Sequence, residues 1–299
     1  MFILEWMQQI RNPVLDVFFK VASMLAEPMV SIVVIAVFFY FIDKNFAYRI
    51  GFAMTFGLML NGFLKPLFAI KRPWMINPKL SPVGGAHGAD TSFSFPSGHT
   101  QNAVALYGSF AIYLKHILFK VLPILIIILV ALSRMYLGVH TLWDVSTSIL
   151  INLFLLLLVY KLPLDRHNKK RDISMVSAIL LAVLVLCIVI RFKPYADGYE
   201  FEVVKDSFSA AGILFGLLPS WLFEKYAVGY RSAPGIFKKV LTLLIGFAGA
   251  GLILVGSEML LQIMSVPAEI TQGVKYMLPI WWAFGLCPLI VKKSIGKDN

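Results

Sequence analysis

The residues best suited to chemistry in this chain lie in three short stretches between positions 65 and 144. One stretch is basic, one combines a hydroxyl group with a histidine, and one pairs a histidine with a carboxylate. Side chains of these types can bind an anion, carry a proton or attack an electrophile. The surrounding sequence is mostly apolar, so these polar groups stand out as candidates for one site. The candidates are Lys65, Arg72, Ser97, Gly98, His99, Arg134, His140 and Asp144.

The middle stretch reads Phe-Pro-Ser-Gly-His at residues 95–99 and precedes an apolar segment at 100–114. This order predicts a helix start, where free backbone N–H groups and the positive end of the helix dipole favour an anion. Ser97 adds a hydroxyl donor, Gly98 lets a ligand approach the backbone, and His99 can exchange a proton near neutral pH. A capping turn followed by a surface histidine would explain the same residues.

The two flanking stretches have similarly mixed interpretations. Lys65 and Arg72 are seven residues apart, so both project from one face if a helix continues through them. Such a pair is more often charge at a membrane boundary than a ligand site. His140 and Asp144 have helical i, i+4 spacing, so the carboxylate can accept from one ring nitrogen and leave the other as a base or nucleophile. Such pairs also occur as satisfied core contacts.

The composition predicts a membrane protein with several spans. Of the 299 residues, 59% are hydrophobic and only 14% are charged, and the mean hydropathy is +0.80. Apolar runs long enough to cross a bilayer favour helices over a barrel, so we expect an all-α bundle. The net charge of +11 fits basic cytoplasmic loops better than nucleic-acid binding. Cys187 and Cys287 fall in apolar segments, which favours buried free thiols.

About nine transmembrane helices are expected from these runs. More than half of the 27 Lys and Arg residues fall in the loops after the odd-numbered spans and at the C-terminus. The positive-inside rule then places those loops in the cytoplasm, and the N-terminus and loop 71–96 outside. The expected spans are 28–42, 50–70, 100–114, 121–137, 142–160, 173–190, 208–223, 240–264 and 274–291.

The same features divide the chain into four parts. Residues 1–27, with aromatic residues and a break at Asn12-Pro13, are expected to form an interfacial amphipathic N-terminus. A core at 28–160 carries the three stretches, a basic cytoplasmic loop covers 161–172, and four spans fill 173–299. Glu258 lies within one of those last spans, either as a structural polar contact or as part of a substrate-binding wall.

In this topology the ends of four helices bring the three stretches to the outer face. Three cations, one anion-binding helix start, two histidines and one carboxylate would meet there. That combination predicts a phosphate site with nucleophilic and acid–base groups.

The three stretches together resemble the three-part signature of the type 2 phosphatidic acid phosphatase superfamily. The matching residues are Lys65-x6-Arg72-Pro73, Pro96-Ser97-Gly98-His99, and Ser133-Arg134-x5-His140-x3-Asp144. The superfamily includes lipid phosphate phosphatases, glucose-6-phosphatase and vanadium haloperoxidases, and the nine-span layout is similar to glucose-6-phosphatase and sphingosine-phosphate phosphatases.

The resemblance implies a role for each candidate. His140 would be the nucleophile that forms a phosphohistidine, Asp144 would fix its tautomer, and His99 would exchange protons with the leaving group and water. The phosphate oxygens would be bound by Lys65, Arg72, Ser97, Gly98 and Arg134. Neither a metal nor another cofactor is expected.

The expected function is therefore a multi-pass membrane phosphatase for a lipid phosphate or polyprenyl diphosphate. Its active site would face outside, with the inner cell membrane as the expected location. A phosphotransferase that uses the same intermediate is one alternative, and a transporter of a phosphorylated solute is another. A transporter would place polar residues at mid-bilayer in broken helices, whereas here they cluster at helix ends. The oligomeric state is not predicted.

Overall fold

The computed structural model describes residues 1–84, 93–194, 200–232 and 235–295. All the regular elements in these ranges are helices, which confirms the all-α prediction. The chain divides into two compact units, Met1–Val33 with Phe56–Leu162, and Val34–Thr55 with Pro163–Asn299. The chain passes from one unit to the other inside helix α3 (Pro28–Val37), inside helix α4 (Lys44–Phe68) and after Leu162. Residues 85–92 of the expected outer loop and Lys297 at the C-terminus lie outside the described residues.

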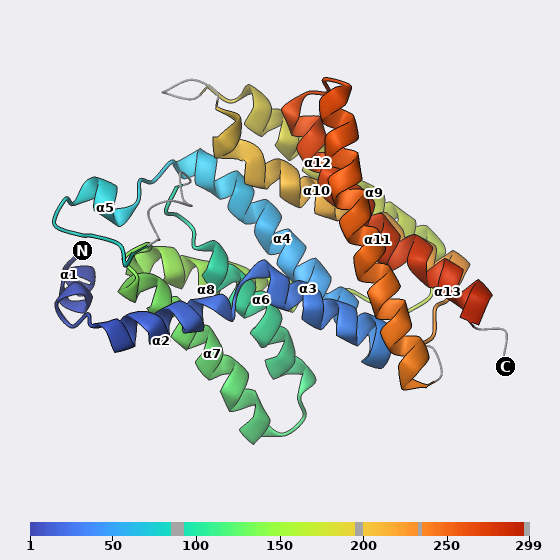
Figure 1. Cartoon of the computed structure of the whole chain (residues 1–299), viewed down its shortest axis with the longest axis horizontal. Helices are drawn as coiled ribbons and strands as arrows, with labels where there is room; N and C mark the ends of the chain where they lie inside the picture. The colour runs from blue at the N-terminus through green and yellow to red at the C-terminus, as the bar shows by residue number, and fades with distance from the viewer. Residues whose placement is uncertain (85–92, 195–199, 233–234, 296–299) are drawn as a thin grey trace. The chain divides into compact units, whose positions relative to one another are not determined.

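The first unit holds the helices that carry the three stretches. Helix α6 packs against both α7 and α8, and α2 packs along α7 (Figure 1). Its elements are α1 (Phe2–Gln9), α2 (Pro13–Met24), the start of α3 (Pro28–Val37), the second half of α4, α5 (Pro73–Ile76), α6 (Gly98–Tyr113), α7 (Ile117–Tyr136) and α8 (Leu142–Lys161).

Local capping explains where several of these helices begin. The Asn12 side chain accepts a hydrogen bond from the Leu15 N–H at 3.0 Å, and Pro13 occupies the first helical position of α2. The break expected at Asn12-Pro13 therefore separates two short helices. Ser97 caps α6 in the same way, so the helix start expected at this residue is confirmed.

The second unit is built around a close contact between α10 (Phe201–Phe223) and α12 (Ala268–Trp281). A Cβ atom at Gly212 would overlap the carbonyl of Gly273, so only glycine at position 212 lets the two backbones come this close. The other elements are the π-helices η1 (Phe38–Ile42), η2 (Glu224–Val228) and η3 (Trp282–Leu286), with α9 (Lys169–Phe192), α11 (Ile236–Ile263) and α13 (Cys287–Ile295).

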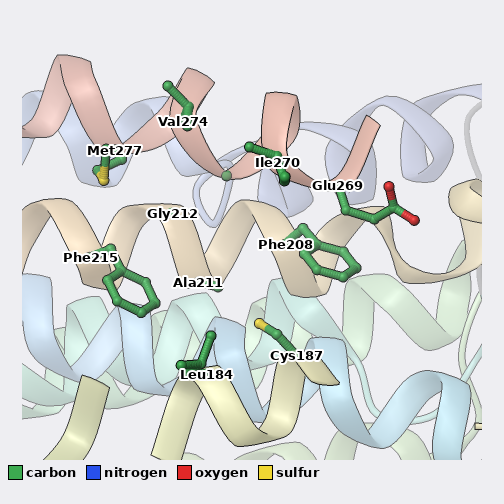
Figure 2. Close-up of a pocket in the computed structure, with 11 residues that line it drawn as sticks. Leu184, Cys187, Phe208, Ala211, Gly212, Phe215, Glu269, Ile270, Val274 and Met277 are labelled. Atoms are coloured by element: carbon green, nitrogen blue, oxygen red, sulfur yellow. The ribbon is translucent and has the colours of Figure 1, made fainter. Parts of the chain in front are cut away.

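An apolar cavity of about 260 Å³ lies between α9, α10 and α12 in this unit. Figure 2 shows Phe208 and Phe215 on one helix above Leu184 and Cys187 on another, with Glu269 at one end. The Glu269 carboxylate pairs with Arg191 at 2.9 Å. The lining therefore suits hydrocarbon, and it lacks the cluster of cations and histidines that phosphate chemistry requires.

The expected count of nine spans is not confirmed. Within the described residues, six helices are long and apolar enough to cross a membrane, or seven if the bent pair of α2 and α3 counts as one. Each of the nine expected segments does overlap a helix. Helix α6, however, has only 16 residues and buries Gln101 and Asn102. Some of its buried side chains are therefore polar, a feature that the length and hydrophobicity of the segment do not predict.

Lys65 and Arg72 do not share one helix face, because α4 ends at Phe68. Ala69 adopts a left-handed backbone conformation with φ of 49°, which turns the chain out of the helix. Arg72 then stands at the N-terminal cap of α5. The two cations thus come from separate elements, and the condition for a shared helix face, a helix that continues from Lys65 through Arg72, is not met.

Candidate active site

His140 lies in the turn between α7 and α8 and is only 2% exposed. Its Nε2 atom is 3.0 Å from Nη1 of Arg72, and its Nδ1 atom is 3.7 Å from Oδ2 of Asp144. A guanidinium group can only donate, so Nε2 must accept and carry the ring's lone pair. The ring proton of neutral His140 is therefore on Nδ1, on the side of Asp144. This tautomer leaves the lone pair of the ring on Nε2.

The Asp144 carboxylate is held by two short hydrogen bonds in addition to its approach to His140. Its Oδ2 accepts from the Ser94 hydroxyl at 2.6 Å and from the Thr141 N–H at 2.6 Å. The Thr141 hydroxyl in turn accepts from the Asp144 N–H, which completes a capping box at the start of α8. Because the helix cap and Ser94 both restrain the carboxylate, it is fixed in place before any ligand binds.

Burial lowers the pKa of His140 below its ordinary value, because the charged ring would lose its solvation. The nearby Asp144 carboxylate opposes this lowering of the His140 pKa, while the positive charges of Arg72 and Arg134 add to it. The sum is a neutral imidazole at neutral pH. A nucleophile requires that state, because protonation would remove the Nε2 lone pair.

The two arginines surround His140 from different elements. Arg72 is 1% exposed and also donates to the Val139 carbonyl at 3.0 Å. Arg134 lies near the end of α7 and is 8% exposed. Its backbone carbonyl accepts from the His140 N–H at 3.3 Å, and its side-chain Nη1 donates to the Ser23 hydroxyl at 2.6 Å. Two cations are therefore held close to one buried imidazole, an arrangement suited to a multiply charged anion.

Lys65 lies in the last turn of α4 with 9% of its surface exposed. One turn earlier, the Asn61 side chain donates to the Pro96 carbonyl at 3.0 Å. This bond joins the end of α4 to the segment that starts α6. Asn61 and Lys65 are four residues apart on α4, so the bond from Asn61 to Pro96 also brings the Lys65 turn close to Ser97.

The start of α6 is tied to α8 through Ser97. The Ser97 N–H donates to the Ser148 hydroxyl at 2.7 Å, and Ser97 itself is fully buried. A Cβ atom added at Gly98 would meet nothing within 4 Å, so open space lies beside the first residue of the helix. That space lies at the positive end of the helix dipole, where an anion is stabilised.

His99 is the second residue of α6 and is partly exposed. Its Nε2 atom is 3.1 Å from Oε1 of Glu27, in the turn between α2 and α3. The structure thus brings together Arg72, Arg134, His140 and Asp144 through direct interactions and ties Ser97 to the same helix as Asp144.

Glu258, the remaining candidate, belongs to the second unit. It lies on α11 and pairs with Lys275 at 2.7 Å. This ion pair gives the carboxylate a structural partner, and a role for it in substrate binding stays a prediction.

Sequence reasoning missed four residues that contact the candidates: Ser23, Glu27, Ser94 and Ser148. Their partners are 50 or more residues away along the chain, so no local spacing identified them. The pattern Thr141-x-x-Asp144 did carry a local signal, because it matches a capping box.

Comparison with known proteins identifies the class to which this bundle and its polar site belong. The chain matches the PAP2 superfamily over residues 46–168 and the transmembrane extension of PAP2 superfamily phosphatases over 208–296. It is 34% identical over 149 residues to phosphatidylglycerophosphatase B of Bacillus subtilis, covering 46% of this chain and 68% of that protein. The chain belongs to the PAP2 superfamily and is a multi-pass integral membrane protein.

More distant similarity extends over more of the chain. A dihydrosphingosine 1-phosphate phosphatase of Schizosaccharomyces pombe is 26% identical over 223 residues, which is 71% of this chain. The alignment covers 53% of that relative, so the chain spans about half its length. A crystal structure of a transmembrane PAP2-type phosphatidylglycerolphosphate phosphatase from Bacillus subtilis aligns with a TM-score of 0.46 and 28% identity, over 53% of this chain and 81% of that one.

Proposed function

We propose that this protein is a metal-independent membrane phosphatase that hydrolyses a lipid phosphate or polyprenyl diphosphate through a phosphohistidine. The observation that carries the proposal is that buried His140 lies between Arg72 and Asp144. Nε2 of His140 carries the lone pair and faces the Arg72 guanidinium, and Nδ1 faces the Asp144 carboxylate. A neutral nucleophile beside a phosphate-binding guanidinium is the combination that attack on phosphorus requires.

In the first step, Nε2 of His140 attacks phosphorus and forms an N–P bond. The P–O bond to the leaving group breaks, and its electron pair stays on the leaving oxygen, which takes a proton from His99. The fixed carboxylate of Asp144 stabilises the positive charge that develops on the His140 ring.

In the second step, a water molecule attacks phosphorus and gives a proton to His99. The N–P bond breaks, its electron pair returns to Nε2, and inorganic phosphate leaves. His99 is again protonated and His140 is again neutral, so the catalytic cycle closes. A lipid or sugar hydroxyl in place of water would make the same intermediate a phosphotransferase.

The cations take the place of a metal ion in this proposal. Arg72, Arg134 and Lys65, with the N-terminus of α6, would neutralise the equatorial oxygens of a loose transition state. Within the described ranges, no group of three or more His, Cys, Asp or Glu side chains is arranged to hold a metal ion. In this proposal the phosphate charge is neutralised by basic side chains.

The proposed substrate class combines the relatives with the chemistry of the site. The named relatives act on a sphingoid-base phosphate and on phosphatidylglycerophosphate, which share a phosphate ester on an amphiphile. The candidate residues lie at helix ends rather than at helix centres, so a lipid could keep its tail among the spans and raise its phosphate to them.

Phosphate release by the purified protein tests this proposal. We expect hydrolysis of at least one member of a panel of lipid phosphates and polyprenyl diphosphates with excess EDTA present. Orthovanadate should inhibit competitively, since a five-coordinate adduct on His140 would mimic the transition state. Loss of activity in EDTA that magnesium restores would contradict the proposed electrostatics, and transport without hydrolysis would favour the alternative class.

We further propose that the site faces the outside of the inner cell membrane. Single cysteines at Lys79 and Lys170, both exposed, can be compared in a background that lacks Cys187 and Cys287. A membrane-impermeant thiol reagent on intact cells should label position 79 and leave position 170 unlabelled until the cells are opened. Labelling at 170 but not at 79 would invert the topology.

A further inference from the structure

The apolar cavity of the second unit is long enough to follow a lipid chain through much of one leaflet. Its lining on α12 extends from Glu269, the second residue of that helix, to Met277. The eight steps of sequence between them, at about 1.5 Å each, span about 12 Å along the helix axis. Half of a bilayer's hydrocarbon core measures about 15 Å. Both α9 and α12 belong to segments long and apolar enough to cross a membrane.

Only one end of this cavity is charged. Glu269 and its ion-pair partner Arg191 lie at that end, and Arg191 is the residue before the last of α9. The other lining residues carry no charge, and Phe208 and Met277 are among them (Figure 2). Helix ends are where a membrane-spanning segment meets the polar interface. The cavity is therefore polar at the interface and apolar farther in, as a membrane lipid is.

The cavity also has the volume and the access that a hydrocarbon chain needs. Its volume of about 260 Å³ exceeds the roughly 150 Å³ of an apolar protein cavity that stays dry and binds benzene. Leu184 on α9 and Ile270 on α12 line the cavity and are both exposed, so the lining reaches the surface of these helices. A chain could enter there from the bilayer, and it would restore the dispersion contacts that empty space denies the lining.

We propose that this cavity binds one acyl chain of a zwitterionic phospholipid from the surrounding membrane. The headgroup lies at the Arg191–Glu269 end, where its phosphate and ammonium groups meet charges of both signs. The chain follows α12 inward toward Met277. The lipid is not a substrate, and the lining residues belong to the second unit, whereas His99, His140 and Asp144 belong to the first. The inference is therefore independent of the proposed phosphatase function.

The first test locates a bound chain by crosslinking. The purified protein is reconstituted with phosphatidylethanolamine that carries a diazirine on one acyl chain, washed with detergent, irradiated and mapped by peptide mass spectrometry. Adducts on Phe208 and Met277 should survive washing that removes those on Leu252, an exposed residue of α11. Loss of the cavity adducts at the same rate as those on Leu252 would overturn the proposal.

Ala211→Phe tests the cavity by filling it. Ala211 is a lining residue on α10, so a phenyl ring at this position takes space that the chain would occupy. The adducts on Phe208 should fall by about tenfold or more, since displacing even two methylene groups weakens binding by about that factor. Ala182→Phe is the matched control, because Ala182 is an exposed residue of α9 outside the lining. Undiminished adducts in folded Ala211→Phe would reject this cavity as the binding place.

A further measurement uses the unaltered protein, so it applies even where Ala211→Phe does not fold. Cys187 lines the cavity, whereas Cys287 is fully buried and is not part of the lining. N-ethylmaleimide should alkylate Cys187 faster after detergent has removed the lipid, and added phosphatidylethanolamine should restore the slow rate. Cys287 should stay unreactive with and without lipid. Equal rates at Cys187 in both states would contradict a bound chain.

The choice of lipid in the same alkylation assay identifies the occupant. Diacylglycerol with the same chains should protect Cys187 less than phosphatidylethanolamine does, because it has no charges to meet Arg191 and Glu269. Equal protection by diacylglycerol would overturn the headgroup assignment. Protection by a lipid phosphate alone, with no effect of phosphatidylethanolamine, would make the cavity a site for substrate tails and would reject the proposal.

Discussion

Replacing His140 with alanine should lower kcat by about 10³-fold or more, the usual effect of removing a catalytic nucleophile. Among the candidates described, this is the one side chain with a lone pair held next to a buried guanidinium. The loss should appear in single-turnover phosphate release and in the disappearance of acid-labile, base-stable phosphoprotein. Alanine also removes the ring that contacts Arg72, so thermal stability is measured alongside.

His116→Ala provides the control for this substitution. His116 is an exposed histidine at the N-terminal cap of α7, and its ring contacts Phe119. It should retain the kcat of the unmodified protein. A folded His140→Ala protein with kcat within tenfold of normal would refute the nucleophile assignment.

Replacing Asp144 with asparagine should lower kcat by about 10³-fold, close to the loss seen when a histidine-orienting carboxylate becomes an amide. Asparagine keeps an oxygen for the Ser94 and Thr141 donors, so α8 should still begin at the same residue. It lacks the negative charge that stabilises a positive His140 ring. The phosphoprotein level after a rapid quench in alkaline denaturant distinguishes slow formation of the intermediate from slow breakdown.

Asp172→Asn is the control that shows whether the loss of kcat in Asp144→Asn comes merely from removing the charge of a buried carboxylate. Asp172 is 1% exposed and bonds to Lys225, Tyr226 and Arg171. Its substitution should lower the Tm while kcat of the folded protein stays unchanged. If Asp144→Asn had the same profile, lower Tm with normal kcat, the orienting role would be excluded.

The parts of the fold and site that could be predicted from the sequence are those with local causes. Ser97 was predicted as the start of a helix because a proline, a hydroxyl residue and a glycine precede an apolar run, and the capping bond forms within four residues. The pairing of His140 with Asp144 follows from i, i+4 spacing. The structure puts a helix cap between the two, so His140 lies just before α8 rather than inside it.

The parts that could not be predicted depend on contacts distant in sequence or on backbone geometry. The span expected at 50–70 ends within two residues of Phe68, but the residues around Ala69 do not predict the left-handed turn that follows α4. Glu27 meets His99 across 72 positions of sequence. Such contacts arise only when α2, α6 and α7 pack, a step that hydropathy and spacing do not specify. The division into four parts and the catalytic and phosphate-binding roles of all the candidate residues stay predictions.

Asp144 combines two roles, completing the capping box of α8 and placing a negative charge beside His140, so a substitution at this position affects both. The residue whose side chain completes the N-terminal capping box of a membrane helix is also the one whose charge faces His140. Serine, threonine or asparagine at this position could keep part of the helix start, yet none would supply the charge. Glutamate would keep the charge but, with one more methylene group, would displace it from Ser94 and Thr141. Laboratory evolution for thermal tolerance should therefore alter α8 elsewhere along its length and leave position 144 unchanged.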